Sequence, residues 1–371
     1  MPSHVLITGG AGFIGSHVAD RLLAQGYRVR VLDALLPQVH GPDAVRPSYL
    51  HPDVELQIGD VRDGTAVRKA LAGVDAVFHF AARVGVGQSM YRVADYTEHN
   101  TLGTAVLMEA LMEHPLERLV VASSMSIYGE GRYRCADGSI TDRVVRSDAQ
   151  LRAGRWDPVG PAGETLVPVP TPEDKLPALS SIYALSKFDQ EIMAMVLGRA
   201  YGIPTTALRF FNVYGEHQAL SNPYTGVLAI FASRLLNDRP PLVFEDGEQR
   251  RDFISVHDVA EACLLALEHT AAIGQVFNIG SGESITVRAI AERMAAALGR
   301  DIAPEISGRF RSGDIRHCFA DTGKARELLG FTASVQLEDG VMQLAEWLAT
   351  QCAEDRVSEA AEELRQRGLS A

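Results

Sequence analysis

The stretch that decides the fold is Val5–Gly15, VLITGGAGFIG. Its first apolar residues are typical of a short buried strand, and the apolar spacing after Phe13 predicts a helix. Glycines between a strand and a helix let the backbone approach a pyrophosphate with no Cβ in the way. Free N–H groups at the helix start then face the phosphates. The stretch therefore predicts a dinucleotide-binding turn; a turn that serves packing alone is the alternative.

A second strand, Arg28–Leu32, ends at Asp33. An acid at this place can accept both ribose hydroxyls of an adenosine, and its charge repels a 2′-phosphate. We therefore expect NAD in preference to NADP as the cofactor. Further short strands are predicted at Val54–Gly59, Val74–Phe80 and Leu119–Ala122, in alternation with helical segments. This pattern predicts the α/β class with a doubly wound parallel sheet of the Rossmann type.

Composition limits the remaining possibilities. A chain of 371 residues with 46% hydrophobic residues suits one large α/β domain with a lobe, or two domains. No apolar run approaches the ~20 residues that span a bilayer, and the N-terminus enters a strand at once, so we expect a cytoplasmic protein with no membrane partner. A net charge of −12 argues against nucleic acid. The cysteines are scattered without a CxxC pair, which favours reduced thiols, and we expect no metal site.

Two polar residues near the predicted adenosine end have two readings each. Asp60, in DVRD, can accept from the adenine amino group with Val61 against the ring, or it can cap the helix predicted at Gly64–Leu71. Asn100 lies on a helix predicted from about Asp95 to Glu113. A buried helical asparagine must find partners, either in a ligand or in the helix itself.

The segment Tyr183–Lys187, YALSK, is predicted at the start of a helix. Residues four apart share one helical face. An ammonium held there beside a positive nicotinamide ring stabilises a phenolate, so we expect it to lower the pKa of Tyr183 from its usual ~10 and make the residue a base at neutral pH.

Together these motifs resemble the extended short-chain dehydrogenase/reductase family, in particular its NAD-dependent nucleotide-sugar epimerases and dehydratases. The resemblance covers almost the whole chain and also includes HFAA (79–82), SSMSIYG (123–129), LRFFNVYG (208–215), RRDFISVHDVA (250–260), FNIGSGE (277–283) and RSGDIRHCFAD (311–321). It implies a catalytic trio of Ser124, Tyr183 and Lys187. The cofactor contacts it implies are Gly9, Gly12, Phe13, Ile14, Gly15, Asp33, Asp60, Val61, Phe80, Ala81, Ala82, Asn100, Ser123, Tyr183 and Lys187.

The resemblance also implies a nucleoside diphosphate sugar as substrate. Its implied contacts are Gln88, Ser124, Ser126, Phe211, Asn212, Val227, Arg251, Arg311 and Asp314, with Tyr224 as a further candidate over the base. Arg251 and Arg311 match the family's diphosphate arginines, and guanidinium groups bind phosphate bidentately. The alternatives are an ion pair between Arg251 and Asp258, and a solvated loop charge at Arg311.

The residues after Ser124 separate the reactions within the family. Dehydratases carry an Asp-Glu pair there, whereas this chain has Met125 and Ser126, which cannot do that acid–base work. The resemblance therefore implies a 4-epimerase, in which Tyr183 takes the 4-hydroxyl proton and hydride returns to the other face of a 4-keto sugar. The open alternatives are a sugar-nucleotide reductase with exchangeable cofactor and, far less favoured, a dinucleotide sensor.

A long connection separates Tyr128 from Tyr183. Its extra segment, about 132–178, is predicted to be a lid or wall of the sugar pocket, with no zinc in Trp156–Pro170. Together with HGPDAVRPSYL (40–50), VGVGQSM (84–90) and RFRSGDIRHC (309–318), the segment resembles bacterial dTDP-6-deoxyhexose 4-epimerases, including those that act on dTDP-L-rhamnose. UDP-hexose and UDP-uronate 4-epimerisation stay open.

The resemblance also divides the chain. Residues 1–206 and 249–281 are expected to form the NAD-binding domain, and residues 207–248 and 282–371 a smaller C-terminal α/β lobe for the nucleotide sugar. In the family, the helices matching 95–113 and 187–201 form a dimer, so a homodimer is expected. The tail, Cys352–Ala371, is predicted to be a peripheral helix with a frayed end.

Overall fold

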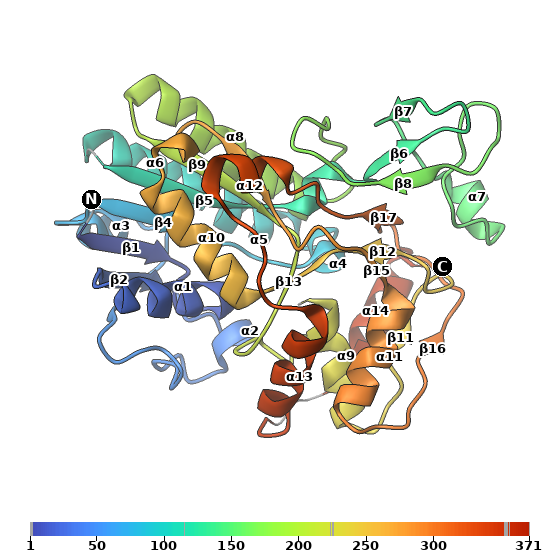
Figure 1. Cartoon of the computed structure of the whole chain (residues 1–371). Coiled ribbons are helices and arrows are strands. Elements are labelled where there is room, and N and C mark those ends of the chain that lie inside the picture. Colours follow the sequence, from blue (N-terminus) through green and yellow to red (C-terminus); the bar gives the residue numbers. More distant parts are fainter. Residues whose placement is uncertain are drawn as a thin grey trace.

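A parallel sheet organises the computed structural model, which describes residues 3–114, 116–222, 224, 226–351, 355 and 357–370. The sheet has seven strands in the order β14-β9-β5-β4-β1-β2-β3, so the predicted doubly wound α/β fold is confirmed (Figure 1). The strands are β1 (His4–Thr8), β2 (Arg28–Asp33), β3 (Glu55–Ile58), β4 (Ala76–His79), β5 (Arg118–Ser124), β9 (Thr205–Phe210) and β14 (Val276–Ile279).

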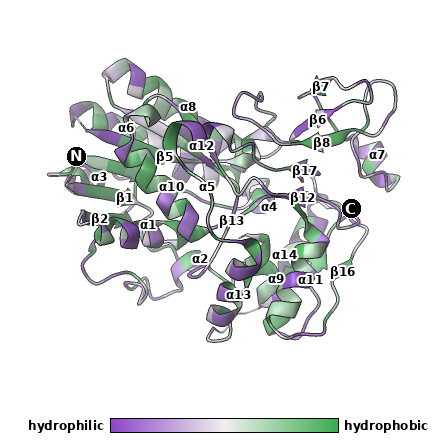
Figure 2. Cartoon of the chain, viewed as in Figure 1, coloured by the Kyte–Doolittle hydropathy of each residue, from purple (hydrophilic) through white to green (hydrophobic). Residues whose placement is uncertain are grey.

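Alternating side chains bury both faces of this sheet. In β1, Val5 and Ile7 point to one hydrophobic cluster and Leu6 to the other, because successive side chains of a strand face opposite ways. Figure 2 shows the central strands as largely hydrophobic and the covering helices as mixed. One face is covered by α1 (Phe13–Ala24), α10 (Val256–Glu268) and α12 (Gly323–Leu329), the other by α3 (Gly64–Leu71), α6 (Gly103–Glu113) and α8 (Ile182–Tyr201).

The order of the strands creates a crevice. The chain builds β2 and β3 on one side of β1, and then β4 and β5 on the other side. At such a switch point the connections leave in opposite directions, which opens a crevice at the carboxyl ends of the strands. The glycine turn after β1 and the HFAA segment after β4 meet there.

A smaller lobe packs around its own hydrophobic cluster, built by α9 (Val227–Leu236), α11 (Val287–Ala297) and α13 (Leu337–Leu348). Short strands join it to the large sheet: β10 (Asn212–Tyr214) pairs with β13 (Phe253–Ser255), β11 (Leu242–Val243) with β16 (Glu305–Ile306), and β12 (Arg250–Arg251) lies between β15 (Ile285–Thr286) and β17 (His317–Cys318).

Two details differ from the domain bounds expected above. Strand β9 continues in the large sheet to Phe210, beyond residue 206. Helix α12 packs on a face of the large sheet although it lies within 282–371. Both follow from the chain crossing between the lobes several times.

The long connection before Tyr183 is structured. It forms a three-stranded antiparallel sheet of β6 (Arg132–Arg134), β7 (Ile140–Thr141) and β8 (Val167–Val169), and the short helix α7 (Asp148–Arg152). Figure 1 shows this unit projecting beside β17, away from β1 and β2.

The remaining short elements border the crevice or the lobes. They are α2 (Pro37–His40), α4 (Val86–Ser89), α5 (Val93–Tyr96), a π-helical turn η1 (Thr97–Leu102), the 3-10 turns η2 (Met125–Tyr128) and η3 (Thr270–Ala272), and the C-terminal helix α14 (Val357–Gln366). No described helix is long and apolar enough to cross a membrane. Cys135, Cys263 and Cys318 are free thiols, and Cys352 lies outside the described residues.

Candidate active site

One cavity of about 600 Å3 unites most of the predicted site. It is lined by the glycine turn, by the ends of β2, β4 and β5, by the start of α8, and by loops of the smaller lobe. Of the predicted cofactor contacts, Asn100 alone is missing from its lining. Of the predicted substrate contacts, Gln88 alone is missing.

The glycine turn has the space that a dinucleotide needs. Gly9 adopts φ +70°, and a Cβ there would lie 2.7 Å from the backbone nitrogen of Ala81. A Cβ on Gly15 would lie 2.5 Å from the Cα of Gly10, so these glycines allow backbone segments to pack closely. Helix α1 has no side-chain cap, which leaves its first N–H groups to an anion.

Asp33 lies at the end of β2, is 9% exposed, and lines the cavity. Its carboxylate accepts hydrogen bonds from the backbone nitrogens of Ala11, at 3.0 Å, and Leu35, at 2.9 Å. These bonds fix the carboxylate beside the turn at the cavity wall, where His40 Nε2 also lies 3.7 Å from Oδ1. A donor pair such as the two ribose hydroxyls fits this position, so the chain's own residues fit NAD.

Asp60 and Val61 also line the cavity, but Asp60 does not cap α3. The capping alternative is wrong, because Asp63 accepts the bond from the Thr65 nitrogen at 2.8 Å. Asp60 instead accepts from the guanidinium of Arg62 at 3.0 and 2.7 Å. Burial by itself raises the pKa of Asp60, but these bonds outweigh it and leave the pKa below the usual value.

Asn100 has a structural place outside the cavity. It lies in the π-helical turn η1 and is fully buried. Its amide accepts from the Arg83 backbone nitrogen at 2.6 Å and donates to the Arg83 carbonyl at 3.0 Å and to Ser186 Oγ at 2.9 Å. The side chain therefore ties the loop after β4 to α8, which is a bridging role that the sequence did not predict.

Gln88 lies beside the cavity, in a neighbouring hollow that it lines together with α2 and the chain around His217. Its carbonyl oxygen accepts from Gln38 at 3.3 Å and from the Tyr96 hydroxyl at 3.2 Å. The contact between Gln88 and substrate remains a prediction at the edge of the site.

The catalytic trio comes together from two elements. Ser124 ends β5 and caps the η2 turn by accepting from the Ser126 nitrogen at 3.2 Å, and the Ser126 hydroxyl donates to Ser124 Oγ at 2.9 Å. Tyr183 and Lys187 lie one turn apart at the start of α8. The backbone nitrogen of Tyr183 donates to Ser89 Oγ at 3.0 Å. All three members line the cavity.

Burial governs the electrostatics of the trio in the chain without a cofactor. Burial raises the pKa of Tyr183, and the hydrogen-bonding Ser124 side chain opposes that rise. Lys187 directs its ammonium to Gln190 Oε1 at 2.6 Å, and burial lowers its pKa to about 7. In the chain without a cofactor the pKa of Tyr183 is not lowered, because Lys187 faces Gln190 and burial disfavours both charges. The lowering expected beside a nicotinamide cation stays a prediction.

A buried polar chain extends behind Lys187. Gln190 donates through Nε2 to Thr104 Oγ1 at 2.9 Å and lies 3.2 Å from His79 Nε2. Burial, with Lys187 nearby, lowers the pKa of His79 to about 3, so its ring is neutral. Sequence reasoning missed Gln190; its position three residues after Lys187, on the same helical face, was the available signal.

The smaller lobe supplies cationic groups to the other end of the cavity. Arg251, on β12, donates to the carbonyls of Arg250 at 2.9 Å, Arg316 at 3.0 Å and Ile315. Burial lowers its pKa. Asp258 accepts from Ser334 and Val335, so the alternative pairing with Arg251 is wrong. No described carboxylate forms an ion pair with Arg251, which suits it to an anionic ligand.

Arg311 is not a freely solvated charge. Its Nε donates to Asp314 Oδ2 at 2.8 Å, and its guanidinium lies 4.3 Å from the centre of the Phe244 ring. Asn212, Phe211 and Val227 line the same region. Stacking and pairing together hold the Arg311 guanidinium in one orientation at the cavity wall.

The C-terminal tail is not peripheral, which corrects the prediction. Helix α14 contributes Val357, Ala360, Ala361 and Leu364 to the cavity lining. Glu363 accepts from the hydroxyls of Tyr91, at 2.8 Å, and Tyr224, at 3.0 Å. The apolar face of α14 therefore covers the cavity, while Cys352 and Ala371, the two ends of the predicted segment, lie outside the described residues.

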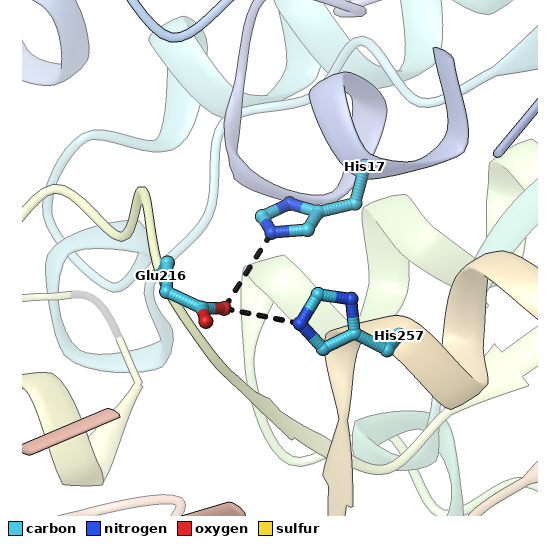
Figure 3. Close-up of side chains that lie close together, drawn as sticks. All are labelled: His17, Glu216 and His257. Atoms are coloured by element: carbon cyan, nitrogen blue, oxygen red, sulfur yellow. Dashed lines mark ion pairs between the residues drawn. The ribbon is translucent and has the colours of Figure 1, made fainter. Parts of the chain in front are cut away.

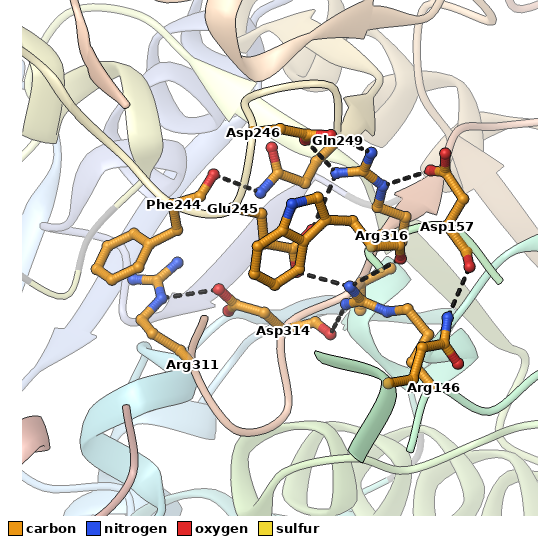
Figure 4. Close-up of polar contacts among 12 residues, drawn as sticks. Arg146, Asp157, Phe244, Glu245, Asp246, Gln249, Arg311, Asp314 and Arg316 are labelled. Carbon is orange, nitrogen blue, oxygen red and sulfur yellow. Dashed lines mark hydrogen bonds and ion pairs between the residues drawn. The ribbon is translucent and has the colours of Figure 1, made fainter. Parts of the chain in front are cut away.

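The insertion at 132–178 does not line the cavity, so its prediction as a direct lid or wall is wrong. The insertion instead contacts residues next to the cavity lining through the ion network in Figure 4. Arg146 donates to Glu245 Oε1 at 2.6 Å and to the Asp314 carbonyl at 2.8 Å. Arg316, 1% exposed, donates to Glu245, Asp246 and Asp157.

This network connects the insertion to the loop that carries Arg311. Glu130 accepts from Arg146 Nε at 2.8 Å and from the Arg316 backbone nitrogen. The side chains of Arg146 and Glu245 are only 4% and 1% exposed. The insertion thus supports the 309–318 loop on the side away from the cavity. The residues of this ion network could not be predicted from the sequence, because they lie far apart in the chain.

Comparison with known proteins places these features in a family. A sequence profile of the NAD dependent epimerase/dehydratase family matches residues 5–145 and 159–280. The dTDP-L-rhamnose 4-epimerase of Burkholderia thailandensis is 37% identical over 351 residues, which cover 93% of this chain and 94% of that protein.

Solved structures of other proteins support the same family assignment. UDP-glucose 4-epimerase of Thermotoga maritima, solved with UDP-glucose, has a TM-score of 0.76 at 30% identity and covers 93% of this chain and 98% of its own. UDP-glucose 4-epimerase of Thermus thermophilus, solved with NAD, has a TM-score of 0.74 at 30% identity over 94% of this chain and 99% of its own. The chain therefore belongs to the NAD-dependent epimerase/dehydratase family and is a nucleotide-sugar 4-epimerase family enzyme that uses NAD.

Proposed function

We propose that this enzyme interconverts the C4 epimers of a dTDP-6-deoxyhexose such as dTDP-L-rhamnose. The observation that carries the proposal is the single cavity that contains the glycine turn, Ser124, Tyr183, Lys187 and the two arginines of the smaller lobe. The 37% identity to the Burkholderia dTDP-L-rhamnose 4-epimerase supports the choice of sugar.

In this proposal, NAD is held by the glycine turn, Asp33 and the small residues Ala81 and Ala82, and it supplies the hydride acceptor and, once reduced, the donor. Tyr183 takes the proton from the 4-hydroxyl and returns it. Ser124 hydrogen-bonds the same oxygen and fixes the C4 carbinol. Lys187, whose pKa is about 7 without a ligand, regains its charge next to a phenolate and stabilises it.

The arginines hold the diphosphate while the sugar turns. Arg251 and Arg311 are fixed by backbone carbonyls, Asp314 and Phe244, so they bind the phosphates without following the sugar. The bond between diphosphate and sugar then acts as the pivot about which the 4-keto sugar presents its other face. Met125 and Ser126 offer no acid–base pair for dehydration.

The cavity lining favours a neutral sugar over a uronate. Among the described residues that line the cavity, the arginines and lysines are Lys187, Arg251 and Arg311, all of which already have roles. A sugar carboxylate would need a further cation, because an unpaired charge in a closed site is costly. Met90, Met125 and Phe211 line the cavity and suit a methyl group at C5.

Incubation with dTDP- and UDP-linked hexoses, 6-deoxyhexoses and uronates, followed by NMR at C4, tests the proposal. We expect C4 epimerisation of a dTDP-6-deoxyhexose without added NAD. Turnover of only UDP-glucose or UDP-uronates would instead identify a UDP-hexose or UDP-uronate 4-epimerase. The structural similarity to UDP-glucose 4-epimerases supports this second candidate. A requirement for stoichiometric NAD(P)H would identify a reductase instead.

The variant Tyr183→Phe tests the assigned base. It keeps the ring but removes the hydroxyl, so we expect loss of turnover by about 100-fold or more. Bound NAD should be retained. Turnover close to that of the parent enzyme would refute the role of Tyr183.

We also propose a cytoplasmic homodimer. Leu102 on η1, and Ile192 and Val196 on α8, are 49%, 42% and 57% exposed, which is a large apolar exposure on neighbouring helices. On the same two helical segments, Met108 is buried in the sheet cluster and Met193 packs against it, so these two side chains belong to the core. Sedimentation of the parent chain against Val196→Glu would test the assembly.

A further inference from the structure

A cluster of imidazole and carboxylate groups lies outside the cavity lining (Figure 3). His17 comes from α1, Glu216 follows β10, and His257 lies in the first turn of α10. Glu216 Oε2 lies 3.7 Å from His17 Nε2 and 3.3 Å from His257 Nε2. One ligand atom from each of the three side chains can be chosen so that these atoms all lie within 4.8 Å of one another.

The hydrogen bonding of His17 fixes which of its nitrogens faces the cluster. Its Nδ1 lies 2.9 Å from the Phe13 carbonyl oxygen. A carbonyl only accepts, so Nδ1 carries the hydrogen, and in the neutral ring Nε2 presents a lone pair to Glu216. Metal-bound histidines commonly donate their other N–H to a carbonyl in this way.

Two lone-pair atoms that face each other at this distance can share a cation between them. His17 is only 7% exposed, so its ring is held in place beside Glu216. A zinc-sized ion with bonds of about 2.0–2.2 Å separates tetrahedral ligands by roughly 3.3–3.6 Å, close to the two distances above. The His257 side chain is 51% exposed, so its ring can turn to complete the set.

We propose that His17, Glu216 and His257 bind one divalent transition-metal ion of the zinc class, with water in the remaining position. Two imidazoles and one carboxylate suit Zn2+, Co2+ and Ni2+ better than Mg2+ or Ca2+. Nothing in the sequence pattern predicts this site, because its members come from distant parts of the chain.

The ion connects three segments around the cavity. His17 lies one turn after Phe13 on the helix that starts at the glycine turn, and Glu216 directly precedes His217 and Gln218, which line the cavity. His217 itself stacks on Tyr49, with 4.3 Å between the ring centres. The ion therefore stiffens this cavity wall and does not contact the reacting sugar.

The test uses the untagged full chain after treatment with a chelator. Co2+ is titrated while its visible d–d absorption is followed, and the bound metal is counted after gel filtration. We expect one Co2+ per chain, displaced by Zn2+, and a higher Tm with metal.

Three variants decide the assignment. Loss of even an outer partner of a metal site weakens affinity by about 10–100-fold, so His257→Ala and Glu216→Gln should each weaken Co2+ binding by more than about 10-fold. His269→Ala, an exposed histidine just after α10, should bind like the parent. Absence of stoichiometric Co2+ in the parent, or equal binding by all variants, would overturn the proposal. The Tm of each metal-free variant reports that it is folded.

Discussion

Arg146 connects the insertion to the 309–318 loop, and the variant Arg146→Met should show how much this connection contributes to stability. The side chain donates to Glu130 Oε1 at 2.8 Å, Glu245 Oε1 at 2.6 Å and the Asp314 carbonyl at 2.8 Å. Methionine keeps most of the volume but makes none of these bonds. Glu245 is then left with Arg316 as its remaining ion-pair partner, at 2.9 Å.

The size of the effect follows from burial. The Arg146 and Glu245 side chains are 4% and 1% exposed. Removing one partner of such a buried pair costs about 3–5 kcal/mol of unfolding free energy when the other charge is left unpaired. Because Arg316 still pairs with Glu245, we expect a loss at the lower end of this range. Adding Glu245→Gln removes that charge, so the double variant should regain part of the loss, with a coupling of about 0.5–3 kcal/mol.

Urea unfolding followed by tryptophan fluorescence measures both variants, since Trp156 lies within the insertion beside Arg146. Arg155→Met, an exposed guanidinium of the same segment, is the control and should change stability by less than about 0.5 kcal/mol. The KM for the nucleotide sugar should rise for Arg146→Met, because Asp314 and Arg311 lose their brace. A loss below about 1 kcal/mol, or no coupling, would refute the reasoning.

The same pair predicts a pH dependence. Burial raises the pKa of Glu245, and Arg146 and Arg316 oppose that rise. Without Arg146 the pKa rises further, so the folded variant holds its proton more tightly than the unfolded chain does. The stability deficit of Arg146→Met should therefore be full at pH 7–8 and shrink as the pH falls toward the ordinary value of 4.5. A deficit independent of pH would contradict this.

Three further changes test other parts of the site. Asp33→Asn should weaken NAD relative to NADP by roughly tenfold or more, measured by equilibrium binding, because the charge facing the ribose is lost; an unchanged ratio would remove Asp33 from cofactor selection. Burial lowers the pKa of Lys187 from 10.5 to about 7, so between these pH values the unfolded chain binds more protons than the folded chain does. The free energy of unfolding of the cofactor-free enzyme should therefore increase as the pH rises through this range. Lys187→Met should reduce that increase, as measured by urea unfolding at several pH values. Leu364→Ala should loosen α14 by about 2 kcal/mol and raise the KM for the nucleotide sugar, whereas Arg365→Gln on the exposed side of the helix should not.

The parts of the site that sequence could predict are local. The glycine turn and Asp33 each follow or end a strand, and Tyr183 and Lys187 lie on one helix. In each case local backbone geometry decides which side chains point the same way. Arg251 and Arg311 were found through motifs of the family, and the structure brings them to the cavity.

What sequence did not predict depends on contacts between distant segments. The ammonium of Lys187 turns to Gln190, and burial governs Tyr183, which no spacing along the chain can reveal. Asn100 serves a loop and a helix far from it in sequence. The insertion acts through Arg146 on residues about a hundred or more positions away, and α14 reaches the cavity although its composition resembles a solvated tail.

The route of the chain into the large sheet has a consequence for how the enzyme forms. Strand β14 pairs with β9, yet helix α9 of the smaller lobe and strands β10 to β13 lie between these two strands in sequence. The sheet edge therefore closes only after this long excursion is brought back, which makes edge formation a late, slow event in folding. Neither lobe is contiguous in sequence, so a truncation after Phe210 that removes the smaller lobe also removes β14 from the large sheet.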